Sequence, residues 1–328
     1  MKKKFFLQTI FGYTLPDFHC LPPNMSSLVS ASSLKRLLAG IALAAALAPA
    51  AHAQNPQSPV LDRIRDTGTI TLGYRESALP FSFGDDKGQP AGYAVDLCLR
   101  VADAARQKLG LKDIKVRWLP LTPQNRVPAV VNGLVDLDCA PNTNTLERQK
   151  QVAFSVSHYV STVRMLVRAD SGIKSFEDLR GKTVVTSAGS TGDRHVRRLK
   201  AEYGYRDVYA KDHGESFLLL ETGRAQAFVM DDVLLAGLRA KSKDPSQYVI
   251  VGPALSVEQN ALMLSKSDPE FKRLVDQTLA RTFASPDAPA LQKRWFQQPI
   301  GARGTNLALA PSAEVLQAWK HPSDAVTE

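Results

Sequence analysis

Residues 116–139, VRWLPLTPQNRVPAVVNGLVDLDC, hold one complete unit of alternating secondary structure. Val116–Leu119 has the short, mostly apolar pattern of a buried strand, and Val135–Cys139 repeats that pattern. Between the two strands, Arg126–Val131 fits a helix that stops at Gly133. A strand, a helix and a second strand in this order predict an α/β unit whose strands run parallel.

The same alternation extends along the chain in both directions. Ile70–Gly73 predicts a strand that precedes a helix over residues 94–109, and Thr183–Thr186 predicts a strand that precedes a helix from about Asp193. The other expected elements are an extended run over Ser161–Arg168, strands at Val208–Tyr209, Ala225–Met230, Tyr248–Val251 and Asn260–Leu264, and helices at Phe217–Glu221, Pro269–Phe283, Leu291–Phe296 and Ala313–Trp319.

Two such series in one chain predict an α/β protein of two lobes with mostly parallel sheets. We expect residues 54–162 to form the first part of lobe 1, residues 163–253 to form lobe 2, and residues 254–328 to return to lobe 1 and end in a tail. Ligands of open α/β sheets bind at the carboxyl ends of the strands, so two facing lobes would form one cleft. Hinge motion at the two crossovers would close the cleft on a ligand.

The first 53 residues have the pattern of an export signal. Lys35-Arg36 precedes the apolar stretch 37–48, and Ala51-His52-Ala53 is a small-residue cleavage site. A membrane anchor is the alternative, but a spanning helix needs about 20 apolar residues. We therefore predict a signal peptide over residues 1–53 and a periplasmic protein. Met25 stands where a start codon would be expected, and a long amino-terminal region of the signal is the alternative.

The charge of the chain after this cleavage is modest. Removing residues 1–53 takes away five of the 41 Lys and Arg side chains and one of the 32 Asp and Glu side chains, which lowers the net charge from +9 to +5. We find no basic run and no basic patch interleaved with aromatic residues. Charge therefore indicates no nucleic-acid partner.

Two cysteines, Cys98 and Cys139, follow the predicted cleavage site. A periplasm would permit a disulfide between them. Two buried thiols are the alternative, because Cys98 shares the apolar face of the predicted helix over residues 94–109. The pair lacks the spacing of a metal site, and we expect no metal and no cofactor.

Charged and hydroxyl side chains gather in loops that follow the predicted strands. An acidic amino acid carries two carboxylates and one ammonium, and this set of side chains matches those needs. Arginine binds carboxylates through two parallel hydrogen bonds, hydroxyls at a helix start bind another carboxylate, and an acid binds the ammonium. Each residue also has a structural explanation, such as the capping box that Asn144 and Glu147 would form. The loops are residues 73–77, 124–126, 141–148, 187–192, 212–214 and 231–232.

Five stretches carry a family resemblance: GYRES at 73–77, QNR at 124–126, ERQKQVAFS at 147–155, KDHGESF at 211–217, and DD at 231–232. Together they closely resemble the periplasmic glutamate/aspartate-binding proteins of the family 3 solute-binding group. The resemblance runs from about Leu61 to the tail. It implies a two-lobed, type II periplasmic binding protein fold and delivery of the ligand to the permease subunits of an ABC importer.

The resemblance also implies a role for individual side chains. Arg148, Thr143 and Thr191 correspond to positions that hold the α-carboxylate of the ligand. Asp231 corresponds to the acid that pairs with the ligand's ammonium. These roles agree with the charges of an amino acid, because an arginine can pair with its carboxylate and an acid can pair with its ammonium.

Three further side chains, Arg75, Arg126 and His213, correspond to the groups that bind the side-chain carboxylate. We count them as three cationic groups, which favour an anionic side chain. The chain departs from the family where Pro123 replaces a serine and where Pro141-Asn142 replaces a Ser-Thr pair. Each proline removes a hydroxyl and an N–H near the ligand, which leaves the choice between glutamate, aspartate and another dicarboxylate open.

Two other functions fit part of the pattern. An enzyme on the same fold, such as a periplasmic cyclohexadienyl dehydratase, would need a cleft acid or base aimed at a substrate carbon, whereas the ligand's charges already account for the candidates. The sensor domain of a receptor would be tethered to a membrane or kinase segment. We expect a monomeric binding protein that is not an enzyme. Its predicted partners are an acidic amino acid and the permease, with another anionic or polar amino acid as the alternative ligand.

Overall fold

The computed structural model of the chain describes residues 58–326. The predicted signal peptide over residues 1–53 lies outside these residues, so its cleavage stays a prediction. Among the residues that the structure describes, no helix combines the length and the apolar character needed to cross a membrane.

The strands of lobe 1 confirm the predicted alternation. β1 (Thr69–Tyr74) lies between β5 (Lys115–Pro120) and β6 (Leu137–Thr143) and runs parallel to both strands. Two helices connect these strands along the chain, α3 (Tyr93–Lys108) before β5 and α4 (Arg126–Val131) between β5 and β6. The carboxyl ends of β1 and β6 therefore lie at the same edge of the sheet, as parallel neighbours require.

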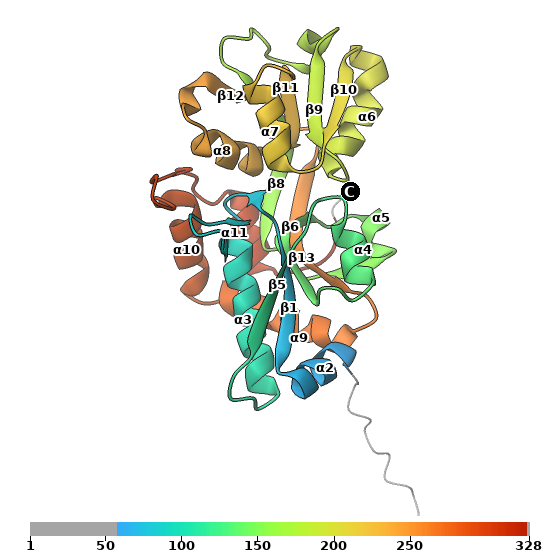
Figure 1. Cartoon of the computed structure of the whole chain (residues 1–328), viewed down its shortest axis with the longest axis vertical. Helices are drawn as coiled ribbons and strands as arrows, with labels where there is room; N and C mark the ends of the chain where they lie inside the picture. The colour runs from blue at the N-terminus through green and yellow to red at the C-terminus, as the bar shows by residue number, and fades with distance from the viewer. Residues whose placement is uncertain (1–57, 327–328) are drawn as a thin grey trace, which may run out of the picture. The chain divides into compact units, whose positions relative to one another are not determined.

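Lobe 2 repeats this arrangement. β9 (Thr183–Ser187) lies between β10 (Arg206–Ala210) and β11 (Ala227–Asp231) and runs parallel to both. α6 (Thr191–Tyr203) follows β9, and α7 (His213–Glu221) follows β10. Figure 1 shows α6, α7 and α8 (Asp232–Lys241) around these three strands.

Two long strands join the lobes. β8 (Tyr159–Arg168) pairs antiparallel with β11 in lobe 2, and β13 (Val257–Ser265) pairs antiparallel with β6 in lobe 1. β8 and β13 also pair with each other, from Val257 opposite Thr162 to Asn260 opposite Tyr159. In Figure 1 they run between the two groups of helices. The expectation of mostly parallel sheets is therefore right for β1, β5 and β6 of lobe 1 and for β9, β10 and β11 of lobe 2. It is wrong at the crossovers, where the chain reverses direction.

The remaining elements extend these sheets, as β7 and β12 do, or pack around them. Before β1, α2 (Pro59–Thr67) is anchored at its N-cap, where the Ser58 hydroxyl donates to Asp268 at 2.7 Å. The other elements are β2 (Ser77–Ala78), β3 (Ser82–Gly84), β4 (Pro90–Ala91), α5 (Leu146–Gln149), β7 (Val152–Phe154), a 3₁₀ helix (Phe176–Leu179), a second 3₁₀ helix (Pro245–Gln247), β12 (Tyr248–Val251), α9 (Pro269–Phe283), α10 (Asp287–Gln292), a π-helical turn (Lys293–Gln297) and α11 (Ala313–Lys320).

A cluster of aromatic rings ties the β8 crossover to lobe 1. The ring of Tyr159, at the start of β8, stacks on Phe296 with centroids 5.1 Å apart and meets the edge of Phe81 at 5.0 Å. Tyr93, the first residue of α3, packs edge-on against Phe296 at 5.5 Å. Stacked and edge-to-face pairs at these spacings are favourable beyond the area that they bury. The cluster therefore packs the start of the β8 crossover against lobe 1.

A disulfide joins α3 to β6. Cys98 and Cys139 are fully buried, and their Cα atoms lie 5.9 Å apart with the two sulfur atoms bonded. Of the two alternatives that the sequence left open, the structure has the disulfide. It holds the helix against the strand whose end, at Thr143, enters the candidate site.

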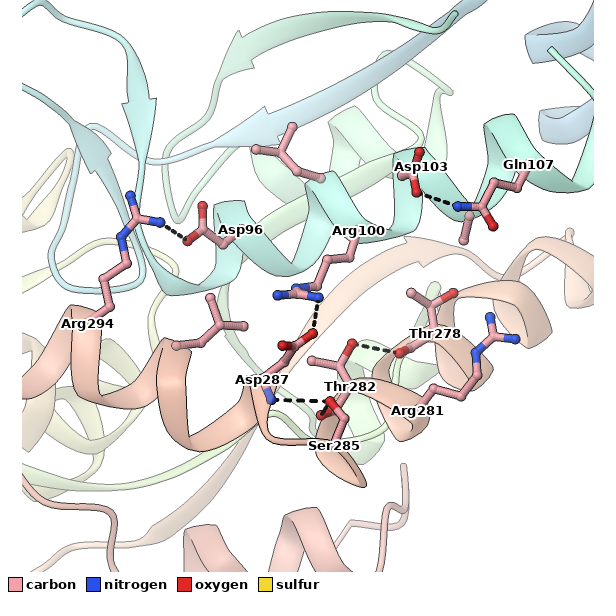
Figure 2. A pocket seen from close by; sticks show the side chains of 13 residues that line it. Asp96, Arg100, Asp103, Gln107, Thr278, Arg281, Thr282, Ser285, Asp287 and Arg294 are labelled. Atoms are coloured by element: carbon pink, nitrogen blue, oxygen red, sulfur yellow. Dashed lines mark hydrogen bonds and ion pairs between the residues drawn. The ribbon is translucent and has the colours of Figure 1, made fainter. Parts of the chain in front are cut away.

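A groove of about 600 Å³ lies between α3 and the α9–α10 pair, outside the candidate site. Figure 2 shows two charged pairs across it: Arg100 contacts Asp287 at 2.6 Å, and Arg294 contacts Asp96 at 3.3 Å. Within α3, Gln107 donates to Asp103 at 2.6 Å. The groove therefore lies along the interface between packed helices. No predicted ligand-binding residue lines it.

Candidate functional site

The two lobes meet at the carboxyl ends of their parallel strands. Arg75 follows β1 and Thr143 ends β6 in lobe 1, whereas the turn before α6 follows β9 and Asp231 ends β11 in lobe 2. The carbonyl of Gly189, in the turn before α6, accepts from Arg126 at 3.3 Å and from Arg148 at 3.1 Å, both of lobe 1. The lobes are therefore in direct contact at the predicted ligand site.

Gly189 permits this close contact. Its φ is +79°, in the left-handed region that favours glycine, and a Cβ at this position would lie 2.9 Å from the Pro123 carbonyl oxygen. Its N–H donates to the Asp193 carboxylate at 2.9 Å, within the first turn of α6. The turn is therefore held by lobe 2 while its carbonyl faces the arginines of lobe 1.

Arg148 lies in the short helix α5. The hydroxyl of Thr145, at the N-cap, accepts from the Arg148 N–H at 3.2 Å. The predicted capping role of Asn144 is therefore wrong, because its side chain instead donates to the Asp324 carbonyl at 2.7 Å. The half-buried Arg148 guanidinium donates to the Thr143 carbonyl at 2.8 Å. Burial lowers the pKa of Arg148 to about 10 against the opposing charge of Glu258, so the side chain stays cationic at neutral pH.

Arg126 forms no ion pair with an acid among the described residues. The side chain is buried, and its guanidinium donates to the carbonyls of Pro123 and Gly189. Its Nε atom has no hydrogen-bond partner among the described residues. Burial lowers the pKa of Arg126, and the neighbouring charges of Arg148 and Arg75 lower it further. An uncompensated buried cation is costly, so this position favours an incoming anion.

Arg75 is already paired. Its guanidinium donates to Asp138 at 3.0 and 2.8 Å and to the Asn142 side-chain oxygen at 2.9 Å, and all three residues are buried. Asp138 was not among the predicted site residues. Asn142, a departure from the family pattern, thus contacts the arginine rather than standing free. Arg75 presents to a ligand only the part of its guanidinium that these two partners leave.

His213 lies at the start of α7 and is buried. Its Nδ1 atom lies 2.8 Å from the Ser187 hydroxyl, which in turn lies 2.8 Å from the Ser216 hydroxyl. Burial lowers the pKa of His213 to about 3, and the charges of Arg75 and Arg126 act in the same direction. The count of three cationic groups is therefore wrong for the ligand-free protein. Arg75 and Arg126 are cations, and the imidazole of His213 is neutral at neutral pH.

Asp231, at the end of β11, is the buried acid on the lobe 2 side of the site. It is 2% exposed, and its Oδ1 atom has no hydrogen-bond partner among the described residues. Burial raises its pKa, as do the negative charges of Glu258 and Asp232. Asp232 is engaged elsewhere, since it accepts from the N–H and the hydroxyl of Thr162 at 3.1 and 2.6 Å. Asp231 is thus a buried acceptor in need of a donor such as an ammonium.

Glu258, on β13, is a further residue of the site that the sequence analysis missed. Its Oε2 atom accepts from the hydroxyls of Thr143 and Thr191 at 2.6 and 2.8 Å, and its Oε1 atom accepts from Ser256 at 2.9 Å. The side chain is 5% exposed. An acid on the second crossover was the available signal. The predicted strand began at Asn260 and left Glu258 outside it.

The structure thus places all seven predicted residues around the contact between the lobes and adds Asp138, Asn142 and Glu258. Within residues 58–326 no group of three or more His, Cys, Asp or Glu side chains could hold a metal ion. The arrangement has buried arginines on the lobe 1 side and, on the lobe 2 side, a buried acid with one carboxyl oxygen that lacks a partner among the described residues. It suits a small ligand that carries both anionic and cationic groups.

The chain is similar to known proteins in both sequence and fold. The family model of bacterial extracellular solute-binding proteins, family 3, matches residues 70–298. An L-glutamate/L-aspartate-binding protein of Pseudomonas aeruginosa is 42% identical over 89% of this chain and 97% of its own length. A glutamate/aspartate import solute-binding protein of Salmonella typhimurium is 42% identical over 92% and 98%. Among solved structures, a mutant of ArgBP from T. maritima aligns with a TM-score of 0.65 and 29% identity, over 72% of this chain and 98% of that chain.

Proposed function

Because the chain belongs to the bacterial extracellular solute-binding proteins of family 3, we propose that it binds an acidic amino acid in the periplasm and delivers it to an ABC importer. Relatives that are 42% identical over nearly their whole length are named for glutamate and aspartate binding. Their names describe binding proteins rather than enzymes. The mature protein would act as a monomer that docks on the permease subunits.

The observation that carries this proposal is that two buried, oppositely charged side chains at the contact between the lobes each have an atom without a hydrogen-bond partner among the described residues. Arg126 has a buried Nε atom without a partner, and Asp231 has a buried Oδ1 atom without a partner. Both side chains are at most 5% exposed. A ligand with a carboxylate at one end and an ammonium at the other would satisfy both, because buried polar groups in stable proteins are almost always hydrogen-bonded.

We assign the ligand's groups as follows. The α-carboxylate would bind Arg148 with the Thr143 and Thr191 hydroxyls, and the ammonium would bind Asp231. The side-chain carboxylate would bind Arg126, the open part of the Arg75 guanidinium, and neutral His213 as a hydrogen-bond donor. Which nitrogen of the imidazole carries the proton follows from its bond to Ser187.

Ligand binding would draw the lobes together about β8 and β13. The lobes proposed here are residues 54–162 with 254–328, and residues 163–253. The contacts of Gly189 with Arg126 and Arg148 belong to the closed form in this proposal. A ligand that contacts both lobes binds the closed form more tightly than the open form, and this difference shifts the population toward closure.

A binding screen tests the proposal. The mature protein, residues 54–328, is titrated by calorimetry with glutamate, aspartate, glutamine, asparagine and small dicarboxylates. We expect glutamate or aspartate to bind at least about tenfold more tightly than the matching amide, a difference of about 1.4 kcal/mol. Equal or tighter binding of glutamine or asparagine would refute the acidic preference. Tightest binding of a dicarboxylate without an ammonium would refute the role of Asp231.

A further inference from the structure

The segment that follows α11, residues 321–326, lies against lobe 1. The Ser323 carbonyl accepts from the Ser157 N–H at 2.9 Å, and the Asp324 carbonyl accepts from the Asn144 side chain at 2.7 Å. Asn144 and Asp324 are 180 positions apart in the sequence. The backbone of the segment is thus bound to two parts of lobe 1 that lie far from it along the chain.

An ion pair holds Asp324 on its other side. Its carboxylate lies 2.9 Å from the Nζ atom of Lys272 on α9, which also contacts Asp276 at 2.5 Å. Asp276 in turn accepts from the Val156 N–H at 2.9 Å. Burial lowers the pKa of Lys272, but its hydrogen bonds to the two acids outweigh this effect and raise the pKa. The lysine is therefore a cation that fixes Asp324 to α9.

The Asp324 carbonyl is bound to both ends of α5. Asn144 precedes the N-cap of this helix, and Gln149 is its last residue. The Gln149 side chain donates to the Asn144 side-chain oxygen at 2.9 Å and lies 3.5 Å from the Asp324 carbonyl. Asn144 is 4% exposed, so its amide needs these partners. The two amides and the carbonyl together connect the beginning of the helix to its end.

α5 depends on such contacts for its position. It has only four residues, far fewer than a helix needs to be stable by itself. Leu146 and Glu147 are exposed, and Arg148 and Gln149 are half-buried, so packing contributes little. Arg148 directly precedes Gln149, and its guanidinium donates to the Thr143 carbonyl at 2.8 Å. The contacts that hold the helix therefore determine where the arginine lies.

We propose that the C-terminal segment positions Arg148 for the ligand's α-carboxylate. The Asp324 carbonyl holds Asn144 and Gln149, and these two side chains hold the helix that carries the arginine. Arg148 binds the ligand, and the segment acts through Arg148. This inference rests on the proposed function for the identity of the ligand. All of these contacts lie within lobe 1, so the inference does not depend on whether the lobes are apart or together.

The binding test uses two shortened forms of the mature protein. One ends at His321, which keeps α11 and removes the Ser323 and Asp324 carbonyls. Its matched control ends at Ala325 and keeps both carbonyls. Calorimetry should show the form that ends at His321 binding glutamate and glutamine alike about three- to tenfold more weakly than the control, the scale of one hydrogen bond. In proteins that also carry Arg148→Ala, the two forms should differ by less than about twofold, because the segment acts through this side chain.

A second measurement needs no ligand. Amide hydrogen exchange of residues 146–151 should be faster in the form that ends at His321 than in its control, because α5 loses its support. Exchange in α6 of lobe 2 should be equal in the two forms. This comparison separates a local effect on α5 from a general loss of stability, which would speed exchange in both helices.

Three results would overturn the inference. The first is equal affinity of the two shortened forms for glutamate. The second is a loss confined to glutamate, which would assign the segment to the side-chain carboxylate instead. The third is a loss of the same size in the presence of Arg148→Ala. If the form that ends at His321 does not fold, Asn144→Ala in the full-length mature protein replaces it, since this change removes the bonds to both Asp324 and Gln149. The same expectations apply to it.

The exchange measurement also separates this inference from the proposed function. If the wild-type protein binds neither glutamate nor aspartate, the proposed function fails. The exchange rates in α5 of the two ligand-free forms still decide whether the C-terminal segment holds the helix that carries Arg148.

Discussion

Arg75 and Asp138 form a buried ion pair with two parallel hydrogen bonds, Nη1 to Oδ1 at 3.0 Å and Nη2 to Oδ2 at 2.8 Å. Their side chains are 5% and 0% exposed. The pair joins the residue that follows β1 to the start of β6, the neighbouring strand. It thus fixes the edge of the lobe 1 sheet from which the candidate site is built.

The first prediction concerns this pair. Asp138→Ala should lower the free energy of unfolding by about 3–5 kcal/mol, because it leaves a buried guanidinium without its counter-ion. Urea unfolding of the ligand-free mature protein measures this change. The matched control is Asp62→Ala, which removes the exposed pair of Asp62 with Arg65 and should cost under about 1 kcal/mol. Equal losses in the two variants would show that burial of the Arg75 pair has no energetic consequence.

The second prediction separates stability from binding at Arg126. Arg126→Met removes a buried cation that is repelled by Arg148 and Arg75, so the free energy of unfolding without ligand should stay the same or rise. The same change should weaken glutamate binding and reduce its advantage over glutamine. Urea unfolding and calorimetry measure the two effects. A variant that binds glutamate like wild type would remove Arg126 from the site.

The third prediction concerns Arg148. Arg148→Ala should weaken glutamate and glutamine alike by about 2–5 kcal/mol, because the α-carboxylate common to both would lose its charged partner. Arg148→Lys should also bind poorly, since one ammonium cannot donate to the ligand while reaching both the Thr143 and Gly189 carbonyls. Binding of glutamate by Arg148→Ala within about threefold of wild type would contradict the assignment.

The fourth prediction is a loss of stability in mild acid. Burial is the main cause that lowers the pKa of His213 to about 3 and the pKa of His158 to about 4. Below about pH 6.5 the unfolded chain takes up protons that the folded protein refuses, so the free energy of unfolding falls as the pH falls toward these values. Each histidine contributes up to about 1.4 kcal/mol per pH unit.

Denaturant unfolding at several pH values between 6.5 and 4.5 measures this slope. His158→Gln and His213→Gln should each make the slope shallower by up to one proton, and the effects should add in the double variant. A slope that neither substitution changes would show that these two imidazoles are not the cause.

The fifth prediction concerns the disulfide. Cys98 and Cys139 are 41 positions apart, so their bond closes a sizeable loop of the unfolded chain. Cys98→Ser with Cys139→Ser should lower the free energy of unfolding by about 2–5 kcal/mol. A reducing agent should bring wild type toward the variant and leave the variant unchanged. If the reductant has no effect on wild type, the two sulfurs are not joined in solution.

Local sequence patterns predicted most of the secondary structure. The predicted bounds of α9, Pro269–Phe283, are those observed, because Asp268 caps the helix by accepting from the Phe271 N–H and Pro269 opens its first turn. α8 was missed, because residues 233–238 are all buried and so show no alternation of polar and apolar faces. The antiparallel crossovers were also beyond the local pattern, because strand direction depends on which strands meet in the folded chain.

The sequence by itself determined which kinds of side chain would reach the site, since residues at the ends of parallel strands are placed by the order of the elements. Only the tertiary structure decided their state. Arg75 is paired with Asp138, 63 positions away, and Thr143 with Glu258, 115 positions away. Burial removes the charge that the sequence suggested for His213. Pairing and burial are produced by contacts between distant parts of the chain, and no local pattern of residues reports them.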